Sequence, residues 1–325
     1  MPSTRPSKPP SRLKGEPGHI DLSSPHRVIG IISESFRPSG HENTSSGLSR
    51  STTMRPYRKL YIYELSDEIP VKGDVFGPDF IGCWNEAGSS FLFFSRNHDE
   101  VVRRWLAHQE RGKLISRHVM DYRDWQGGED LKPFRVEKLV ICPWWEEAEI
   151  AEDEILIRLD PGVVFGTGLH PTTRGCLKAL WRIYQADTPR GVLDIGTGTG
   201  ILAVAAAKLG ARHVLAIDRN GLAVQTARRN VLLNGVKDRV EVKRGEAEAF
   251  AEEKADMVLA NLHLQVIDAL VKREVFLSRR WVVLSGLLHG QVNGIMASLE
   301  QWQLKVHDRM EESRWVTLVL RKNTS

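Results

Sequence analysis

The segment from Asp194 to Gly200 constrains this chain most, because three glycines alternate with other residues between an apolar run and an alanine-rich run. The pattern predicts a strand, a tight turn and a helix. Glycine lets the backbone approach a ligand where a Cβ would collide, and a helix start offers N–H donors and a positive dipole end to a carboxylate. We therefore expect a small anionic or zwitterionic ligand at Gly196, Gly198 and Gly200.

The spacing of the turn and two nearby acids narrow the choice of ligand. A dinucleotide-binding turn has its third glycine one position later, where Ile201 stands. Asp194 can accept from the amino group of an amino acid, and the next apolar run ends in Asp218, which can bind both hydroxyls of a ribose. S-adenosylmethionine, an amino acid joined to a nucleoside, fits both acids. The alternative for the turn taken alone is a tight turn without a ligand.

Length and composition are typical of a globular enzyme. The chain has 325 residues, 41% of them hydrophobic, which favours two domains with a sizeable core. Its three cysteines form no C-x-x-C pair and stand near no histidine cluster, so we expect no metal. No apolar run approaches the roughly 18 residues of a membrane span, and no secretion signal is evident. We expect a cytoplasmic protein without a membrane partner.

The charge pattern does not indicate a nucleic-acid footprint. The net charge is +4, and the dibasic pairs are scattered along the chain. Solvated helix faces explain such pairs, so we expect no direct sequence-specific binding of nucleic acid. Contact with an RNA-rich particle stays compatible with this charge.

Shifts in composition predict four regions. Residues 1–54 are rich in Ser, Pro, Arg and Gly and are predicted to be a disordered tail. Residues 55–122 are predicted to form a small α+β substrate-recognition domain, and 123–154 a linker. In residues 155–325, strands and helices alternate, which predicts an α/β domain with a largely parallel, doubly wound, Rossmann-like sheet. Within the small domain we expect strands at 60–63, 90–94 and 114–120 and a helix at 100–108.

A second glycine-rich stretch, residues 160–173, precedes the turn and opens a helix. Taken alone, it is typical of a loop and a helix capped by Thr172 or Thr173. Because it stands shortly before the cofactor turn, we expect it to cover the ligand, with Phe165 as a wall and Thr173 as a donor. Thr167 and Thr172 belong to the same predicted cofactor site. For His170 we favour a capping role over a catalytic one.

A third segment, residues 255–263, predicts a buried strand that ends in Asn261 at the ligand edge of the sheet. Methyl transfer to an amine needs a neutral nucleophile with its lone pair aimed at the methyl carbon. The side-chain oxygen of Asn261 and the carbonyl of Leu262 can accept the amine hydrogens. His263 can take the departing proton, or simply pack or cap a helix. Glu246 is a candidate for the adenine amino group, and a solvated glutamate is the alternative.

Together these segments resemble the PrmA family, which methylates a protein of the large ribosomal subunit. The resemblance covers about residues 155–320, and its most specific pieces, absent from ordinary methyltransferases, are Phe165 to Gly168 and His170 to Thr173. Further matching pieces are Asp160-Pro161-Gly162, Asp194 to Ala203, Lys208 to Ala211, Asp218, Asn234-Gly235-Val236, Ala260-Asn261 and Leu284-Ser285-Gly286.

The resemblance implies a class I S-adenosylmethionine-dependent methyltransferase that modifies protein amines, with cofactor contacts at Thr173, Gly196, Asp218 and Asn261. It also implies a ferredoxin-like domain at the N-terminal side that captures a ribosomal protein. This chain departs from that pattern at residues 66–82, where the first amphipathic helix is missing and the domain is expected to be degenerate. It departs again at Leu262 and His263, where the family carries isoleucine and another aliphatic residue.

The leading hypothesis is therefore a protein methyltransferase acting on lysine or N-terminal amines of a ribosomal protein. One alternative is a lysine methyltransferase of a non-ribosomal protein. Another is an RNA or small-molecule methyltransferase, although Asn261 is not followed by the prolines and aromatic residue that form a stacking floor for a base. A binding module with a degenerate pocket is the non-enzymatic alternative, against which the intact Asp194, Asp218 and Asn261 argue.

Overall fold

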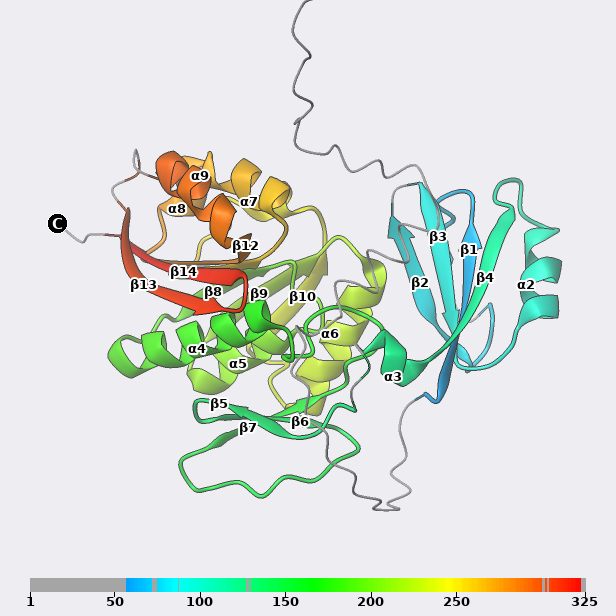
Figure 1. The fold of residues 1–325 in the computed structure, drawn as a ribbon, viewed down its shortest axis with the longest axis horizontal. Helices are drawn as coiled ribbons and strands as arrows, with labels where there is room; N and C mark the ends of the chain where they lie inside the picture. The colour runs from blue at the N-terminus through cyan, green and yellow to red at the C-terminus, as the bar shows by residue number, and fades with distance from the viewer. Residues whose placement is uncertain are drawn as a thin grey trace, which may run out of the picture.

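The computed structural model describes the chain from residue 57 onward. The described residues are 57–71, 75–86, 88–126, 128, 130–299, 302 and 304–322. The predicted tail, residues 1–54, lies outside them. Figure 1 shows a small sheet with one flanking helix beside a larger layered body, and a further short sheet below that body.

The small sheet contains β1 (Lys59–Leu65), β2 (Phe80–Glu86), β3 (Ser89–Phe94) and β4 (Leu114–Asp121), with α2 (Asp99–Leu106) after β3. Neighbouring strands are antiparallel, in the order β2-β3-β1-β4. The structure confirms the predicted β1, β3, β4 and α2 and adds β2. A glycine inside a strand weakens the strand pattern, and Gly82 lies where the β2–β3 pairing shifts register.

The two faces of the small sheet pack against different partners. Tyr63, Leu65 and Phe94 face α2 and form one apolar cluster with it. Leu60 and Phe93 belong to a second cluster on the opposite face, which also contains residues of the large domain. Between β1 and β2, the described residues contain no helix, in agreement with the departure seen at 66–82.

The segment between the two bodies has structure of its own. It begins with α3 (Tyr122–Trp125) and continues with β5 (Phe134–Val136) and β6 (Leu139–Pro143). β6 pairs antiparallel with β5 and parallel with β7 (Ile155–Leu159), so strands of the predicted linker share a sheet with the start of the next domain. We keep the four predicted regions as a proposal for the domain organisation.

The large sheet confirms the predicted fold class. Its strands are β8 (Gly191–Ile195), β9 (His213–Asp218), β10 (Val240–Arg244), β11 (Met257–Asn261), β12 (Trp281–Leu288), β13 (Leu304–Glu312) and β14 (Trp315–Lys322). They lie in the order β10-β9-β8-β11-β12-β14-β13, parallel from β10 to β12 and antiparallel at β14 and β13. This arrangement is a Rossmann-like methyltransferase sheet with an antiparallel edge, and it brings the carboxyl ends of the parallel strands to one side.

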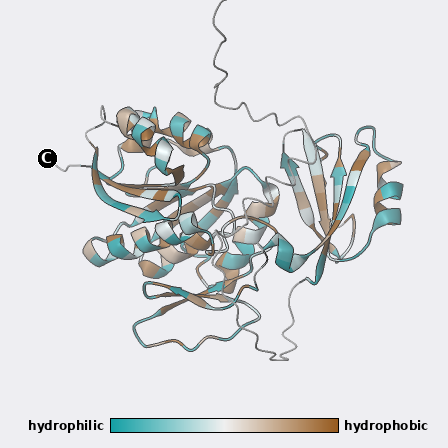
Figure 2. Ribbon diagram, in the orientation of Figure 1, coloured by the Kyte–Doolittle hydropathy of each residue, from teal (hydrophilic) through white to brown (hydrophobic). Residues whose placement is uncertain are grey.

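Helices cover both faces of the large sheet (Figure 1). One face carries α4 (Pro171–Ala186), α5 (Ile201–Leu209) and α6 (Gly221–Leu233), and the other carries α7 (Leu264–Val271), α8 (Glu274–Leu277) and α9 (His289–Leu299). A short 3₁₀ helix, η1, spans Ala247–Phe250. Because parallel strands covered on both sides need mainly apolar residues, β8 and β11 carry a single strongly polar side chain each, Asp194 near the end of β8 and Asn261 at the end of β11. In Figure 2 the helices alternate between hydrophilic and hydrophobic residues, as expected of helices half exposed to water.

Membrane spanning is not supported by the helices. In the part of the chain that the structure describes, no helix combines the length and the hydrophobicity needed to cross a bilayer.

Candidate functional site

The glycine turn joins β8 to α5 at the carboxyl edge of the large sheet. Gly196, Gly198 and Gly200 adopt φ angles of 71°, 56° and 82°, which side-chain-bearing residues rarely adopt. At Gly198 a Cβ would lie 2.3 Å from the carbonyl oxygen of Phe165, so glycine is required by the close approach of a second backbone segment. At Gly196 a Cβ would meet the side chain of Leu262 at the same distance. The turn is therefore packed between the loop before α4 and the end of β11.

The amides of the turn are bonded within the chain. Gly196 and Thr197 both donate to the carbonyl of Ile217 at 2.9 Å, and Gly200 donates to Thr197 at 2.8 Å. Thr199 donates to Phe165 at 3.0 Å, and Gly198 donates to the Asp218 carboxylate at 3.0 Å. The N–H donors expected from the sequence are those at the start of α5, where the Ile201 amide lies 3.4 Å from the Thr199 hydroxyl; the amides of the turn itself are already bonded. The turn offers a ligand a backbone without side chains, which permits close approach, and the positive end of the α5 helix dipole.

Asp194 is a buried carboxylate beneath the turn. Its side chain is 1% exposed, and the Thr197 hydroxyl donates to it at 2.6 Å. Its pKa is raised to about 7, first by burial and also by the nearby charge of Asp218, while the hydrogen bond from Thr197 acts in the opposite direction. A cationic group beside Asp194 would favour the ionised form, so the residue is suited to bind an ammonium.

Asp218 ends β9 and lies next to the turn. Its carboxylate accepts from the backbone N–H of Gly198 at 3.0 Å and of Asn220 at 2.9 Å. Burial raises its pKa, while these two backbone hydrogen bonds lower it. A carboxylate oxygen has further acceptor sites, so both oxygens can still accept from a hydroxyl pair.

The loop of residues 160–170 lies against the turn. The Thr199 hydroxyl donates to the carbonyl of Gly166 at 2.5 Å, and the Thr199 amide donates to Phe165. Thr167 is buried in this loop. The structure thus places the backbone of Phe165 and Gly166 against Thr199 of the glycine turn, and Thr167 follows them in the loop.

Helix α4 begins where the loop ends, and its cap differs from the prediction. His170 is the N-cap: its Nδ1 accepts from the Thr172 amide at 3.3 Å and lies 2.8 Å from the Thr172 hydroxyl. Thr172 and Thr173 are buried inside the helix, so the prediction that one of them caps it was wrong. Pro171 at the first helical position fixes the start, because proline is favoured there. The favoured capping role of His170 is confirmed.

His170 also packs between two aromatic rings, with centroid distances of 5.3 Å to Phe165 and 5.0 Å to Trp315. Its pKa is lowered to about 4, first by burial and then by the positive charges of Arg174 and Arg314, while the charge of Glu312 acts in the opposite direction. The imidazole is therefore neutral near pH 7, as its acceptor role at the cap requires.

Asn261 ends β11 and faces the start of α4. Its side-chain NH₂ donates to the Thr173 hydroxyl at 3.4 Å, which leaves its oxygen available. Leu262 donates its amide to the carbonyl of Ser285 at 3.1 Å, and a Cβ on Gly286 would lie 2.2 Å from the Leu262 carbonyl oxygen. The backbone of Leu262 is thus held by β12 on two sides.

Two predicted site residues, His263 and Glu246, lie at the margin of the site formed by the glycine turn, the loop before α4 and the end of β11. His263 is the N-cap of α7, is exposed, and makes no capping hydrogen bond with its side chain. Glu246 is exposed at the start of η1, and its charge contributes to raising the pKa of Asp218. Within the described residues, no group of three or more His, Cys, Asp or Glu side chains could hold a metal ion.

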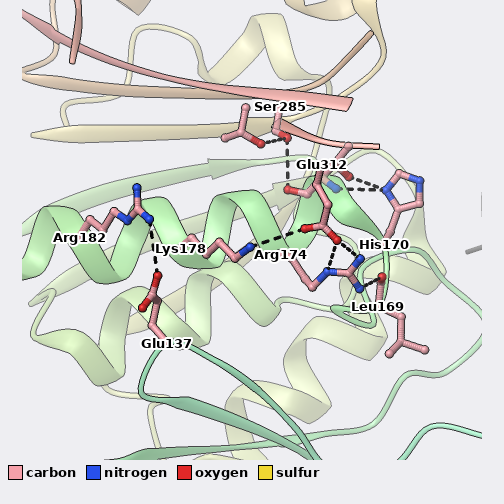
Figure 3. Close-up of polar contacts among 10 residues, drawn as sticks. Glu137, Leu169, His170, Arg174, Lys178, Arg182, Ser285 and Glu312 are labelled. Carbon is pink, nitrogen blue, oxygen red and sulfur yellow. Dashed lines mark hydrogen bonds and ion pairs between the residues drawn. The ribbon is translucent and has the colours of Figure 1, made fainter. Parts of the chain in front are cut away.

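Ion pairs of Arg174 and Lys178 with Glu312 tie α4 to the β13–β14 hairpin (Figure 3). Arg174 donates to Glu312 at 2.9 Å through Nε and also to the carbonyl of Leu169. Lys178 lies 3.6 Å from Glu312, and further along α4 Arg182 pairs with Asp308 at 2.8 Å. Arg174 therefore joins the hairpin to the end of the loop of residues 160–170.

Comparison with known proteins identifies the family. Residues 91–323 match the profile of the family described as "Ribosomal protein L11 methyltransferase (PrmA)". The chain belongs to this family.

The similarity to individual PrmA-family proteins covers part of each chain. A protein of Heliobacterium modesticaldum named "Ribosomal protein L11 methyltransferase" is 38% identical over 194 residues, which are 59% of this chain and 61% of that protein. A protein of the same name from Clostridium perfringens is 40% identical over 191 residues, 58% of this chain and 60% of that protein. The alignment thus spans about three fifths of these relatives.

Among solved structures, the ribosomal protein L11 methylase of Lactobacillus delbrueckii subsp. bulgaricus is similar. It is 31% identical, with a TM-score of 0.53, and covers 59% of this chain and 100% of that chain. The comparison supports a methyltransferase sheet preceded by a small antiparallel domain.

Two residues that shape the site, Thr199 and Gly286, stand in the matching pieces of the sequence but were assigned no role there. Thr199 ties the loop of residues 160–170 to the turn through both its amide and its hydroxyl, and no local pattern predicts such partners. Gly286 makes room for the Leu262 carbonyl. A glycine within a strand pattern is a sign of close backbone approach and could have indicated this position.

Proposed function

We propose that this PrmA-family protein is an S-adenosylmethionine-dependent methyltransferase that modifies amines, lysine side chains or an N-terminus, of a ribosomal protein. The observation that carries the proposal is the glycine turn that follows β8, with Asp194 one residue before the end of β8 and Asp218 at the end of the neighbouring parallel strand β9, in a chain that belongs to this family. The relatives' names, which refer to ribosomal protein L11, support that protein as the substrate.

The residues at the turn suit the cofactor. Asp194 would accept from its ammonium group, and Asp218 would accept from both ribose hydroxyls. Gly196, Gly198 and Gly200 would allow the backbone to approach it, and Glu246 is our candidate for the adenine amino group. Phe165, Thr167, Thr172 and Thr173, on the loop and the first turn of α4, would cover it.

S-adenosylmethionine supplies a methyl group on a positively charged sulfur. An in-line displacement requires the acceptor nitrogen to be neutral and aimed at that carbon, so positioning dominates the rate. The free oxygen of Asn261 and the carbonyl of Leu262 would accept the two amine hydrogens and thereby orient the lone pair. The contact of the Asn261 side-chain nitrogen with the Thr173 hydroxyl at 3.4 Å supports an orientation in which the oxygen is the acceptor.

The acceptor must lose a proton before it reacts, because a free lysine has a pKa near 10.4. Exclusion of water favours the neutral amine at the site. No strong general base is needed for this step. Exposed His263, whose ring is open to water, would pass the departing proton to solvent.

The small domain is our candidate for capturing the protein substrate. We place the protein in the cytoplasm, where ribosomal proteins are found, and propose neither a membrane partner nor direct sequence-specific binding to nucleic acid.

Transfer of label tests the function. Purified protein is incubated with methyl-labelled S-adenosylmethionine and, in separate reactions, ribosomal subunits, total protein extract and protein-free RNA. We expect label on an amine of a ribosomal protein, loss of labelling in Asp218→Ala, and normal labelling in Asp238→Ala, which removes an exposed acid away from the site. Label on RNA alone would overturn the proposal. Label on a protein of the extract, with none on a ribosomal protein, would show that the substrate is a non-ribosomal protein.

A further inference from the structure

The loop of residues 160–168 is held by the large domain at its start. Asp160 pairs with Arg229 of α6 at 3.1 Å and accepts through its carbonyl from the side chain of Asn230 at 2.8 Å. The same Asn230 amide donates to the carbonyl of Thr199 at 2.8 Å. The beginning of the loop and the glycine turn are therefore fastened to one buried side chain of α6.

The middle of the loop is packed against the small domain. Val163 and Val164 are buried in the apolar cluster that contains Phe93 of β3 and Trp125 of α3. α6 contributes Leu222 to the same cluster, and Arg219, which lies between β9 and α6, pairs with Glu86 of β2 at 3.0 Å. The loop thus lies between the small sheet and the proposed cofactor site.

Tyr122, the first residue of α3, reaches the loop directly. Its hydroxyl donates to the carbonyl of Gly162 at 2.6 Å, and Gln126 donates to the same oxygen at 3.4 Å. Tyr122 is 5% exposed, and its ring meets Tyr57 edge-on with centroids 5.3 Å apart. Burial raises the pKa of Tyr122 well above its ordinary value, so the hydroxyl keeps its proton and stays a donor.

The far end of the loop transmits this restraint to the turn. Phe165 and Gly166 accept from the amide and hydroxyl of Thr199, three and four residues after Gly162. The backbone of Gly198 lies so close to the Phe165 carbonyl that a Cβ would not fit between them. A shift of the loop would therefore move the backbone of the turn as well.

We propose that Tyr122 is a positioning residue that couples the seating of the small domain to the cofactor site, by holding the loop of residues 160–168 on the glycine turn through Gly162. The effect on cofactor affinity rests on the function proposed above. The mechanical coupling is a property of the free protein and is measured separately.

Tyr122→Phe removes only the hydroxyl and keeps the ring in the apolar cluster. Tyr184→Phe is a matched control, because the Tyr184 hydroxyl is also buried and donates to a backbone carbonyl, that of Pro189, at 2.8 Å. Both variants are made in the full chain. Thermal unfolding shows that each folds, amide hydrogen exchange is followed in peptides spanning 160–170 and 196–202, and calorimetry gives the affinity for S-adenosylmethionine.

A buried hydrogen bond of this kind contributes roughly two- to tenfold to an equilibrium constant. In Tyr122→Phe we expect exchange in both peptides to quicken and S-adenosylmethionine affinity to fall by that factor. In Tyr184→Phe the exchange rates of both peptides and the affinity for S-adenosylmethionine should match the wild type, although each variant is expected to lower the unfolding temperature.

Unchanged exchange in Tyr122→Phe would overturn the coupling, and quicker exchange with unchanged affinity would overturn the positioning role. If the wild type itself bound no S-adenosylmethionine, the proposed function would fail. The exchange comparison would still decide whether Tyr122 holds the loop.

Discussion

The ionisation of Asp194 leads to a specific pH dependence. Its pKa of about 7 means that the carboxylate is about three-quarters ionised at pH 7.5 and about one-tenth ionised at pH 6.0. Because only the ionised form pairs well with an ammonium, the apparent affinity is reduced by the fraction that is competent. We therefore expect S-adenosylmethionine affinity to fall about eightfold between these pH values, in a range where an α-amino group stays largely cationic.

Whereas cofactor affinity is expected to rise with pH, the contribution of Asp194 to folding stability falls as the pH rises. Its pKa in the folded protein lies above the ordinary value of 3.8, so between pH 3.8 and about 7 the folded state binds more protons than the unfolded one. Stability contributed by protonated Asp194 is then lost as the pH rises through this window, by about 4 kcal/mol in total at about 1.4 kcal/mol per pH unit. Asp194→Asn, which can still accept from Thr197, should be more stable than the wild type at pH 8 and similar to it at pH 4.

Calorimetric titration from pH 6.0 to 7.5 and denaturant unfolding from pH 4 to 8 measure both effects. Asp194→Asn should bind more weakly at pH 7.5 and show an affinity that is nearly independent of pH, whereas the exposed control Asp238→Asn should keep the wild-type slope. A wild-type affinity constant to within twofold across the range would refute the reasoning. So would an Asp194→Asn variant with the wild-type slope.

Three glycines give further predictions. Gly198→Ala places a Cβ against the Phe165 carbonyl in a left-handed conformation, so S-adenosylmethionine affinity should fall more than about tenfold by calorimetry, and wild-type affinity would contradict the packing described. Gly286→Ala should displace the Leu262 carbonyl and lower the kcat for methyl transfer about tenfold or more while changing cofactor affinity less than about threefold; an unaffected kcat would remove that carbonyl from the mechanism. Gly294→Ala, in α9 with nothing within 4 Å of its added Cβ, should raise stability by up to about 1 kcal/mol in thermal unfolding, and destabilisation would show an unseen constraint.

The large sheet and its turn could be predicted because their signals are local. Strands of a buried parallel sheet are short apolar runs, and here a polar residue stands at or next to the carboxyl end of each: Asp194 before the last residue of β8, Asp218 at the end of β9 and Asn261 at the end of β11. The position of each side chain at that edge follows from strand direction alone.

The missed features depend on distant partners or on context. β2 escaped prediction because Gly82 and the preceding Pro78 indicate a turn, while pairing with β3 stabilises a strand there. The cap of α4 was misassigned because threonine is a favoured cap, whereas Pro171 moves the start of the helix one residue after His170.

The fate of the turn's amides could not be predicted, because the accepting carbonyls of Ile217 and Phe165 belong to other segments. The contact of Tyr122 with Gly162, forty residues away, depends on how the small sheet lies on the large domain. Neither is encoded in a local pattern.

The most direct test of the account is a crystal structure of the full chain with S-adenosylmethionine bound. We expect the cofactor at the carboxyl edge of β8 and β9, with its ammonium at Asp194, its ribose hydroxyls at Asp218 and its methyl group facing Asn261. Well-ordered cofactor density at another place, or its absence from crystals grown with saturating S-adenosylmethionine, would contradict the account.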